Sequence, residues 1–142
     1  MKASVACPTR VDFAGGTLDC WPIPSFLERC CTVNLSISIF TKVDVVTNDG
    51  PEISVNIKDL EYTNRFSNLQ ELLNCKDKEI QLLAANLRFW RPHKGFSVTT
   101  ESQSPMGGGL GGSSSLLISM LTAFARLYKK QWTVDEMIHV AH

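Results

Sequence analysis

The most informative stretch of this chain is Pro105-Met106-Gly107-Gly108-Gly109-Leu110-Gly111-Gly112-Ser113-Ser114-Ser115. It follows residues 96–101, which have the composition of a strand, and leads into an apolar stretch of helical character at residues 116–128. Glycines leave the backbone bare, so successive N–H groups can surround an anion, and the positive end of the following helix points to the same place. A strand, a glycine loop and a hydroxyl-rich helix start together predict a phosphate-binding site.

Two simpler interpretations of the glycine run are a flexible linker and a P-loop. A linker has no need of the apolar or rigid residues Pro105, Met106 and Leu110 within it. A P-loop requires a lysine after its last glycine, and Ser113 stands there instead. The P-loop is therefore excluded, and a linker or plain turn stays as an alternative.

The run also matches a dinucleotide-binding pattern. Gly107, Gly109 and Gly112 satisfy G-x-G-x-x-G. That pattern is specific only with a second strand and an acidic residue about 20 residues further on. Residues 127–132 show no strand pattern. A dinucleotide site is therefore a minor alternative.

Composition limits the class of protein. The 142 residues carry no net charge, 44% of them are hydrophobic, and the five cysteines form no C-x-x-C pair. This predicts a single domain with a packed core and no disulfide framework or zinc site. No basic stripe suggests nucleic acid, and no apolar run has the length of a membrane span. We also see no signal-peptide pattern, and we expect a cytoplasmic protein with reduced thiols.

Hydrophobic periodicity predicts strands followed mostly by helices. Strands are expected at residues 3–14, 32–47, 52–57 and 96–100, and helices at 67–74, 77–89 and 113–128. Asn48-Asp49-Gly50 is a turn signal that predicts a hairpin between the second and third strands. Thr133-Val-Asp-Glu136 is a capping box that opens a last helix. This order favours an α+β sandwich over a doubly wound sheet.

A second polar motif lies at the end of the first strand. Arg10 is followed by Gly15, Gly16 and Asp19 in the next loop. An Asp accepts hydrogen bonds from sugar hydroxyls, and an Arg can hold that Asp or reach phosphate oxygens. Asp12 alternates with Arg10 along the strand and is interpreted as structural. Taken alone, the motif could also be a turn with an incidental salt bridge.

Together the two motifs resemble the N-terminal half of the GHMP kinases, which include galactokinase, homoserine kinase, mevalonate kinase and phosphomevalonate kinase. The family's loop reads roughly P-x-G-x-G-L-G-S-S, and its first motif in sugar kinases reads roughly R-V-N-L-x-G-E-H-T-D. The loop is matched by Pro105, Gly107, Gly109, Leu110, Gly111 and Ser113, with Gly112 in place of the first Ser. The first motif is matched by Arg10, Val11, Gly15 and Asp19, with Gly16 and Thr17 in place of Glu-His. The Ala-Gly-Gly form is more similar to the heptose-phosphate kinase and fucokinase branch.

The resemblance implies a two-layer α+β sandwich like domain 2 of ribosomal protein S5. It also implies ATP and Mg²⁺ as cofactors, with Ser113 meeting the β-phosphate and the metal. The ATP-binding residues would be Pro105, Gly107, Gly108, Gly109, Leu110, Gly111, Gly112, Ser113 and Ser114. The residues that bind a sugar or sugar phosphate would be Arg10, Gly16, Thr17 and Asp19.

The implied activity is transfer of the γ-phosphate of ATP to a hydroxyl of a sugar or sugar phosphate. The family's catalytic Asp, its magnesium-binding Glu and its C-terminal domain would lie beyond His142. Residues 1–142 are therefore expected to be a truncated N-terminal ATP-binding domain that holds no catalytic residue and is inactive by itself. The surface left without its C-terminal domain is expected to favour self-association. A nucleotide-binding module without transfer activity and a dinucleotide-dependent oxidoreductase domain stay as alternatives.

Overall fold

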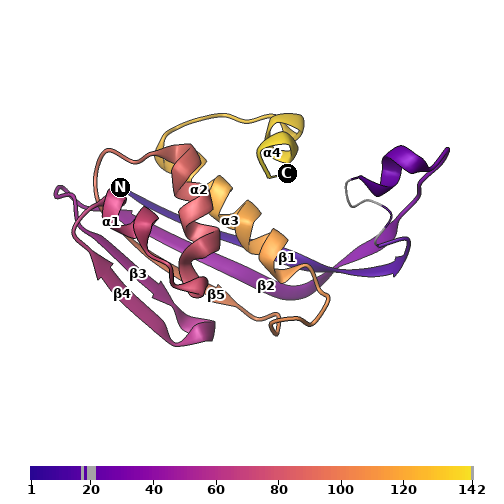
Figure 1. The fold of residues 1–142 in the computed structure, drawn as a ribbon, viewed down its shortest axis with the longest axis horizontal. Coiled ribbons are helices and arrows are strands. Elements are labelled where there is room, and N and C mark those ends of the chain that lie inside the picture. Colours follow the sequence, from indigo (N-terminus) through magenta and orange to yellow (C-terminus); the bar gives the residue numbers. More distant parts are fainter. Residues whose placement is uncertain (17, 19–21, 142) are drawn as a thin grey trace.

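The computed structural model describes residues 1–16, 18 and 22–141. This part of the chain is a five-stranded sheet with helices packed over one face (Figure 1). The strands are β1 (Lys2–Ala14), β2 (Val33–Thr47), β3 (Ile53–Ile57), β4 (Tyr62–Phe66) and β5 (Phe96–Ser102). The α-helices are α1 (Leu69–Asn74), α2 (Gln81–Trp90), α3 (Gly112–Leu127) and α4 (Val134–Ala141). Short 3₁₀ turns are η1 (Ile23–Phe26), η2 (Lys58–Leu60) and η3 (Lys78–Ile80). The predicted α+β sandwich is confirmed.

Alternation along β1 and β2 sets which face of the sheet meets the helices. The two strands pair antiparallel, with Val5 opposite Val43 and Ala3 opposite Val45. These side chains are buried, whereas the neighbouring Lys42 is exposed. Because successive side chains of a strand point to opposite faces, one face carries the core and the other meets solvent. Figure 1 shows the two strands running on past the helices at one end.

The predicted hairpin between β2 and β3 is wrong. The strand order is β1-β2-β5-β3-β4, so β5 lies between them, antiparallel to β2 and parallel to β3. The Asn48 N–H donates to the Gly95 carbonyl at 3.0 Å, and the Gly95 N–H donates to the Gly50 carbonyl at 2.7 Å. The residue just before β5 thus forms the backbone hydrogen bonds that a closed β2–β3 hairpin would have formed within itself. No local signal shows this insertion, because it depends on residues that are distant in the sequence.

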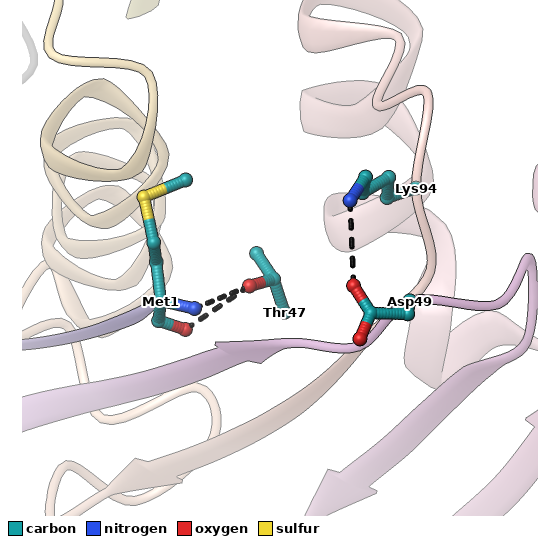
Figure 2. Close-up of polar contacts among 4 residues, drawn as sticks. All are labelled: Met1, Thr47, Asp49 and Lys94. Atoms are coloured by element: carbon teal, nitrogen blue, oxygen red, sulfur yellow. Dashed lines mark hydrogen bonds and ion pairs between the residues drawn. The ribbon is translucent and has the colours of Figure 1, made fainter.

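Polar contacts beside this insertion tie three segments together (Figure 2). The Lys94 ammonium lies 3.4 Å from the Asp49 carboxylate, which joins the start of β5 to the turn after β2. The Met1 ammonium donates to the Thr47 hydroxyl at 2.6 Å, and the Thr47 N–H donates to the Met1 carbonyl at 2.9 Å. The end of β2 is therefore anchored on both sides.

Two of the helices, α1 and α4, begin at side-chain caps. The Glu71 N–H donates to the Asn68 side chain at 3.0 Å at the start of α1. The predicted capping box of α4 is confirmed, since the Thr133 N–H donates to Glu136 at 2.8 Å and the Glu136 N–H donates to the Thr133 hydroxyl at 3.2 Å. None of the helices described is long and apolar enough to cross a membrane.

An aromatic cluster holds the segment before α4 against α2. The Trp90 ring lies 5.4 Å from that of Tyr128 and 5.5 Å from that of Trp132, and the Phe89 ring lies 5.6 Å from that of Trp132. The Lys130 ammonium lies 4.5 Å from the centre of the Trp132 ring. Aromatic pairs and cation–π contacts at these distances are attractive, so they fix the connection between α3 and α4.

Candidate functional site

The glycine loop, residues 103–111, connects β5 to α3 and borders a cavity of about 700 Å³. Because β5 is the central strand, the loop emerges from the middle of the sheet. The lining residues are Ile57, Asp59, Leu60, Lys78, Glu79, Leu82, Leu83, Thr100, Ser102, Leu116, Met120 and every residue from Ser104 to Ser113. All the predicted ATP-binding residues except Ser114 therefore border one cavity.

The loop backbone is left-handed at alternate glycines. The φ angles are +73° at Gly107, +69° at Gly109 and +66° at Gly111. A Cβ at Gly107 or Gly109 would meet nothing within 4 Å, so these residues face open space. Glycine is required there by backbone conformation and not by close packing. The open cradle suits a ligand that approaches the backbone itself.

The start of α3 is available to an anion. Gly111 is the N-cap residue, no side chain caps the helix, and its first turn holds no acidic residue. The first N–H groups of a helix lack partners within it and carry a partial positive charge. Ser113 and Ser114 are exposed in this turn, and Ser113 lines the cavity. The site therefore fits phosphate oxygens, and the Ser113 hydroxyl is a suitable ligand for a hard cation such as Mg²⁺.

The structure brings the Arg10 motif to the glycine loop. The backbone N–H of Arg10 donates to the Leu110 carbonyl at 3.1 Å. The Arg10 side chain lies along Gly111, since a Cβ built there would be 3.6 Å from Arg10 Cγ. Two segments that lie far apart in the sequence thus form one edge of the site.

Asp12 connects Arg10 to the glycine turn that follows β1. Arg10 Nε lies 3.2 Å from Asp12 Oδ1 in a half-exposed ion pair. A Cβ at Gly16 would lie 2.9 Å from both Cβ and Oδ2 of Asp12, so Gly16 packs directly against that side chain. These contacts agree with a structural role for Asp12.

Three positions named in the sequence predictions lie outside the described residues. Thr17 and Asp19 are two of the predicted substrate-binding residues, and the structure does not describe either of them. His142, the position beyond which the family's catalytic Asp is expected, is not described either. The roles of Thr17 and Asp19, and the place of the catalytic Asp after His142, therefore stay predictions.

Sequence reasoning missed the part of the cavity wall that lies outside the loop. Lys78 and Glu79 come from η3, while Thr100 and Ser102 come from β5. Thr100 is 3% exposed, and among the described residues its hydroxyl has no hydrogen-bond partner. The Ser104 N–H donates to the Ser102 hydroxyl at 3.2 Å, which turns the chain from β5 into the loop. These residues carry no local motif, so only the tertiary structure identifies them.

Metal-binding clusters of the common kind are absent from the described residues. No group of three or more His, Cys, Asp and Glu side chains gathers closely enough there to hold an ion. A cation at this site would depend on the Ser113 hydroxyl together with oxygens of a bound phosphate.

The glycine loop and both helices that follow it fall within a match to a known family. The family model described as "GHMP kinases N terminal domain" matches residues 72–142. The chain belongs to the GHMP kinase family. A search among curated protein sequences gave no match.

This GHMP kinase domain shares its fold with solved kinase structures. Mevalonate kinase of Methanococcus jannaschii has a TM-score of 0.79 at 20% identity, covering 99% of this chain and 45% of that one. D-glycero-D-manno-heptose 1-phosphate kinase from Bacteriodes thetaiotaomicron has a TM-score of 0.84 at 23% identity, with coverages of 99% and 46%. Streptococcus pneumoniae phosphomevalonate kinase, solved with phosphomevalonate and AMPPNP, has a TM-score of 0.71 at 14% identity, with coverages of 97% and 40%. The chain thus spans less than half the length of these structures.

Proposed function

We propose that this chain is the ATP-binding, N-terminal domain of a kinase that transfers the γ-phosphate of ATP to a hydroxyl of a sugar or sugar phosphate. The observation that carries the proposal is the glycine loop, with three left-handed glycines, opening onto the cavity at the uncapped start of α3. Membership of the GHMP kinase family supports it. So does the similarity to a kinase solved with AMPPNP.

The proposed division of the site follows from its chemistry. Backbone N–H groups from Gly107 to Ser113 bind the phosphates, and the Ser113 hydroxyl contributes to a magnesium site. ATP supplies the phosphoryl group, and the residues of this chain hold it in place. Phosphoryl transfer depends mainly on such positioning and on charge stabilisation.

The nucleoside would occupy the part of the cavity away from the loop. Leu60, Leu82 and Leu83 supply apolar walls there, and Lys78 and Thr100 supply polar atoms. A mostly apolar cavity with a few polar groups is the usual environment of a bound small molecule. A volume of about 700 Å³ is within the range of such pockets.

The acceptor would lie on the Arg10 side of the loop. Arg10 can donate to phosphate oxygens of the acceptor or of the transferred group, and Asp19 would accept from its hydroxyls. Heptose 1-phosphate kinase and phosphomevalonate kinase are named for small hydroxylated or phosphorylated acceptors, which supports an acceptor of this class. No residue up to His142 is proposed as the catalytic base.

Ligand titration tests the nucleotide site. Isothermal titration with AMPPNP and Mg²⁺ is expected to show saturable binding, and NADH is expected to show none. Tight NADH binding without AMPPNP binding would establish the dinucleotide alternative instead.

A kinase assay tests the reaction. The full-length gene product, incubated with ATP, Mg²⁺ and a panel of hexoses, heptoses and their phosphates, is expected to release ADP with at least one acceptor. Nucleotide binding without transfer to any acceptor would instead support a binding module.

A further inference from the structure

An irregularity in the pairing of β1 with β2 lies two residues before Arg10. Along the β1–β2 ladder Pro8 pairs with Phe40, but Thr9 pairs with Ile37, so the register shifts between them. Proline has no N–H to donate to a ladder, which favours an irregularity at this position. The shift leaves Ser38 and Ile39 of β2 without partners in β1, so the extra residues of this bulge belong to β2. The Pro8 carbonyl therefore lies at the last paired position before the register shift, two residues before Arg10.

That carbonyl is bound by a serine of α3. The Ser115 hydroxyl lies 3.0 Å from the Pro8 carbonyl and 3.2 Å from the Cys7 carbonyl. It also lies 2.9 Å from the Thr41 hydroxyl, which is 3.0 Å from the Ser119 hydroxyl. Thr41 and Ser119 are fully buried, and Ser115 is 9% exposed. We call Ser115, Thr41 and Ser119 the hydroxyl chain.

Proton counting gives the hydroxyl chain a direction. Each hydroxyl has one proton, and the carbonyls of Cys7 and Pro8 can only accept. With the Ser115 proton on one of these carbonyls, the Thr41 proton goes to the Ser115 hydroxyl or to the Cys7 carbonyl, which lies 3.5 Å away, and Ser119 donates to Thr41. A buried series of this kind is strengthened by mutual polarisation.

The contacts close a ring between the two motifs. The Ser115 N–H donates to the Gly111 carbonyl at 2.9 Å, so Ser115 belongs to the turn that ends the glycine loop. The Ser115 hydroxyl donates to the Pro8 carbonyl, and the backbone N–H of Arg10 donates to the Leu110 carbonyl in the glycine loop. The position of Arg10 is thus connected to the loop by two independent routes.

We propose that Ser115 is a positioning residue that couples occupancy of the glycine loop to the placement of Arg10. The inference rests on the proposed nucleotide site, because the bound triphosphate is what would order the loop. A nucleotide that fixes Gly111 and the first turn of α3 also fixes Ser115, which then holds the Pro8 carbonyl, beside the register shift two residues before Arg10. Ser115 touches neither reactant in this proposal.

Hydrogen exchange with and without AMPPNP and Mg²⁺ tests the coupling in the full-length gene product. In the wild-type protein, nucleotide is expected to slow exchange both in residues 106–114 and in residues 8–12. In Ser115→Ala, protection of residues 106–114 should remain, and the gain at residues 8–12 should fall by about three- to tenfold, the equivalent of one hydrogen bond.

Ser119→Ala is the matched control. Ser119 is buried on the same helix and contacts the same Thr41, but within the described part of the chain its hydroxyl makes no hydrogen bond to β1. A merely structural role for buried hydroxyls would affect both variants alike, whereas the coupling predicts that only Ser115→Ala loses the gain at residues 8–12. Equal losses in both variants would overturn the proposal, as would an undiminished gain in Ser115→Ala.

Ser115→Cys covers the case in which the alanine variant does not fold. It keeps the shape of the side chain with a weaker donor, and the same selective loss is expected. If AMPPNP protects neither segment of the wild-type protein, the nucleotide proposal fails and the coupling fails with it. If only residues 106–114 gain protection, the nucleotide site stands and the coupling alone is wrong.

Discussion

Single residues control the glycine loop through backbone conformation. Gly107, Gly109 and Gly111 all have φ angles near +70°. A residue with a Cβ costs about 1–2 kcal/mol in this region, and a β-branched residue is a marked outlier there. Since the space around Gly107 and Gly109 is open, that cost alters the loop and not the core.

Gly109→Val is therefore expected to weaken nucleotide binding by about tenfold or more, because valine disfavours the backbone that presents the N–H groups. The melting temperature should change little. Titration with AMPPNP and thermal unfolding measure the two effects. Gly50→Val is the control, since its Cβ also meets nothing within 4 Å and its φ is not left-handed. Unchanged affinity in a folded Gly109→Val protein contradicts the proposed site.

Gly16→Ala is expected to weaken binding of the acceptor and to leave binding of the nucleotide unchanged. The new Cβ would lie 2.9 Å from Asp12 Cβ, so Asp12 must shift, and we expect its ion pair with Arg10 to be disturbed. Loss of a half-exposed ion pair should change the affinity for the acceptor by only a few-fold. The KM of the acceptor measures this change. An unaltered acceptor KM would show that Asp12 does not position Arg10. Gly50→Ala is the matched surface substitution.

Asp19→Asn tests the sequence motif directly. Loss of a charge-assisted hydrogen bond to an acceptor hydroxyl costs about 1.5–3 kcal/mol, or roughly one to two decades in affinity. Acceptor binding should fall by that amount, while AMPPNP binding stays within a factor of two or so. A collapse of nucleotide affinity with intact acceptor binding would reverse the assignment.

At the scale of elements, α4 depends on its capping box. The backbone N–H of Thr133 is the main cause of a lowered pKa at Glu136, and the Thr133 hydroxyl and the charge of Lys130 act in the same direction. A carboxylate whose pKa is lowered on folding stabilises the fold at pH above its ordinary pKa of 4.5. That contribution is lost as the pH falls through the folded value.

We therefore expect hydrogen exchange at residues 134–141 to accelerate between neutral pH and pH values below 4.5, relative to the intrinsic rate. Glu136→Gln cannot ionise, so its α4 should show no such change over the same range. A wild-type α4 whose relative exchange rate is the same on both sides of pH 4.5 would show that the capping carboxylate does not stabilise the helix.

At the scale of the whole molecule, β5 joins the two halves of the sheet. It pairs with β2 on one side and with β3 on the other, and its end leads into the glycine loop. Its start passes so close to the turn after β2 that a Cβ at Gly95 would collide with the carbonyl oxygen of Glu52. The fold and the site therefore depend on the same strand.

Gly95→Ala is expected to destabilise the protein by about 1–3 kcal/mol, because the nearest obstructing atom is a backbone oxygen that cannot rotate away. The free energy of unfolding in urea measures this effect. Gly50→Ala, in the same turn but with nothing near its Cβ, should be close to neutral. Equal stability of the two variants would show that β5 can shift without cost.

Features whose causes lie within a few residues could be predicted from the sequence. The glycine loop before α3, the capping box at Thr133 and Glu136, and the alternation of β1 and β2 are of this kind, and the structure confirms them as local structure. The sequence pattern does not predict the strand β4, because its five residues Tyr62–Phe66 carry little alternation and pair only with β3.

The way in which these elements combine could not be predicted from local patterns. Insertion of β5 between β2 and β3, the contact of Arg10 with Leu110, and the cavity wall formed by Lys78 and Thr100 all join residues far apart in the chain. Strand pairing and packing are set by which apolar faces can be buried together, and that is a property of the whole chain. A local pattern such as Asn48-Asp49-Gly50 can therefore mark a true turn and still predict the wrong neighbour.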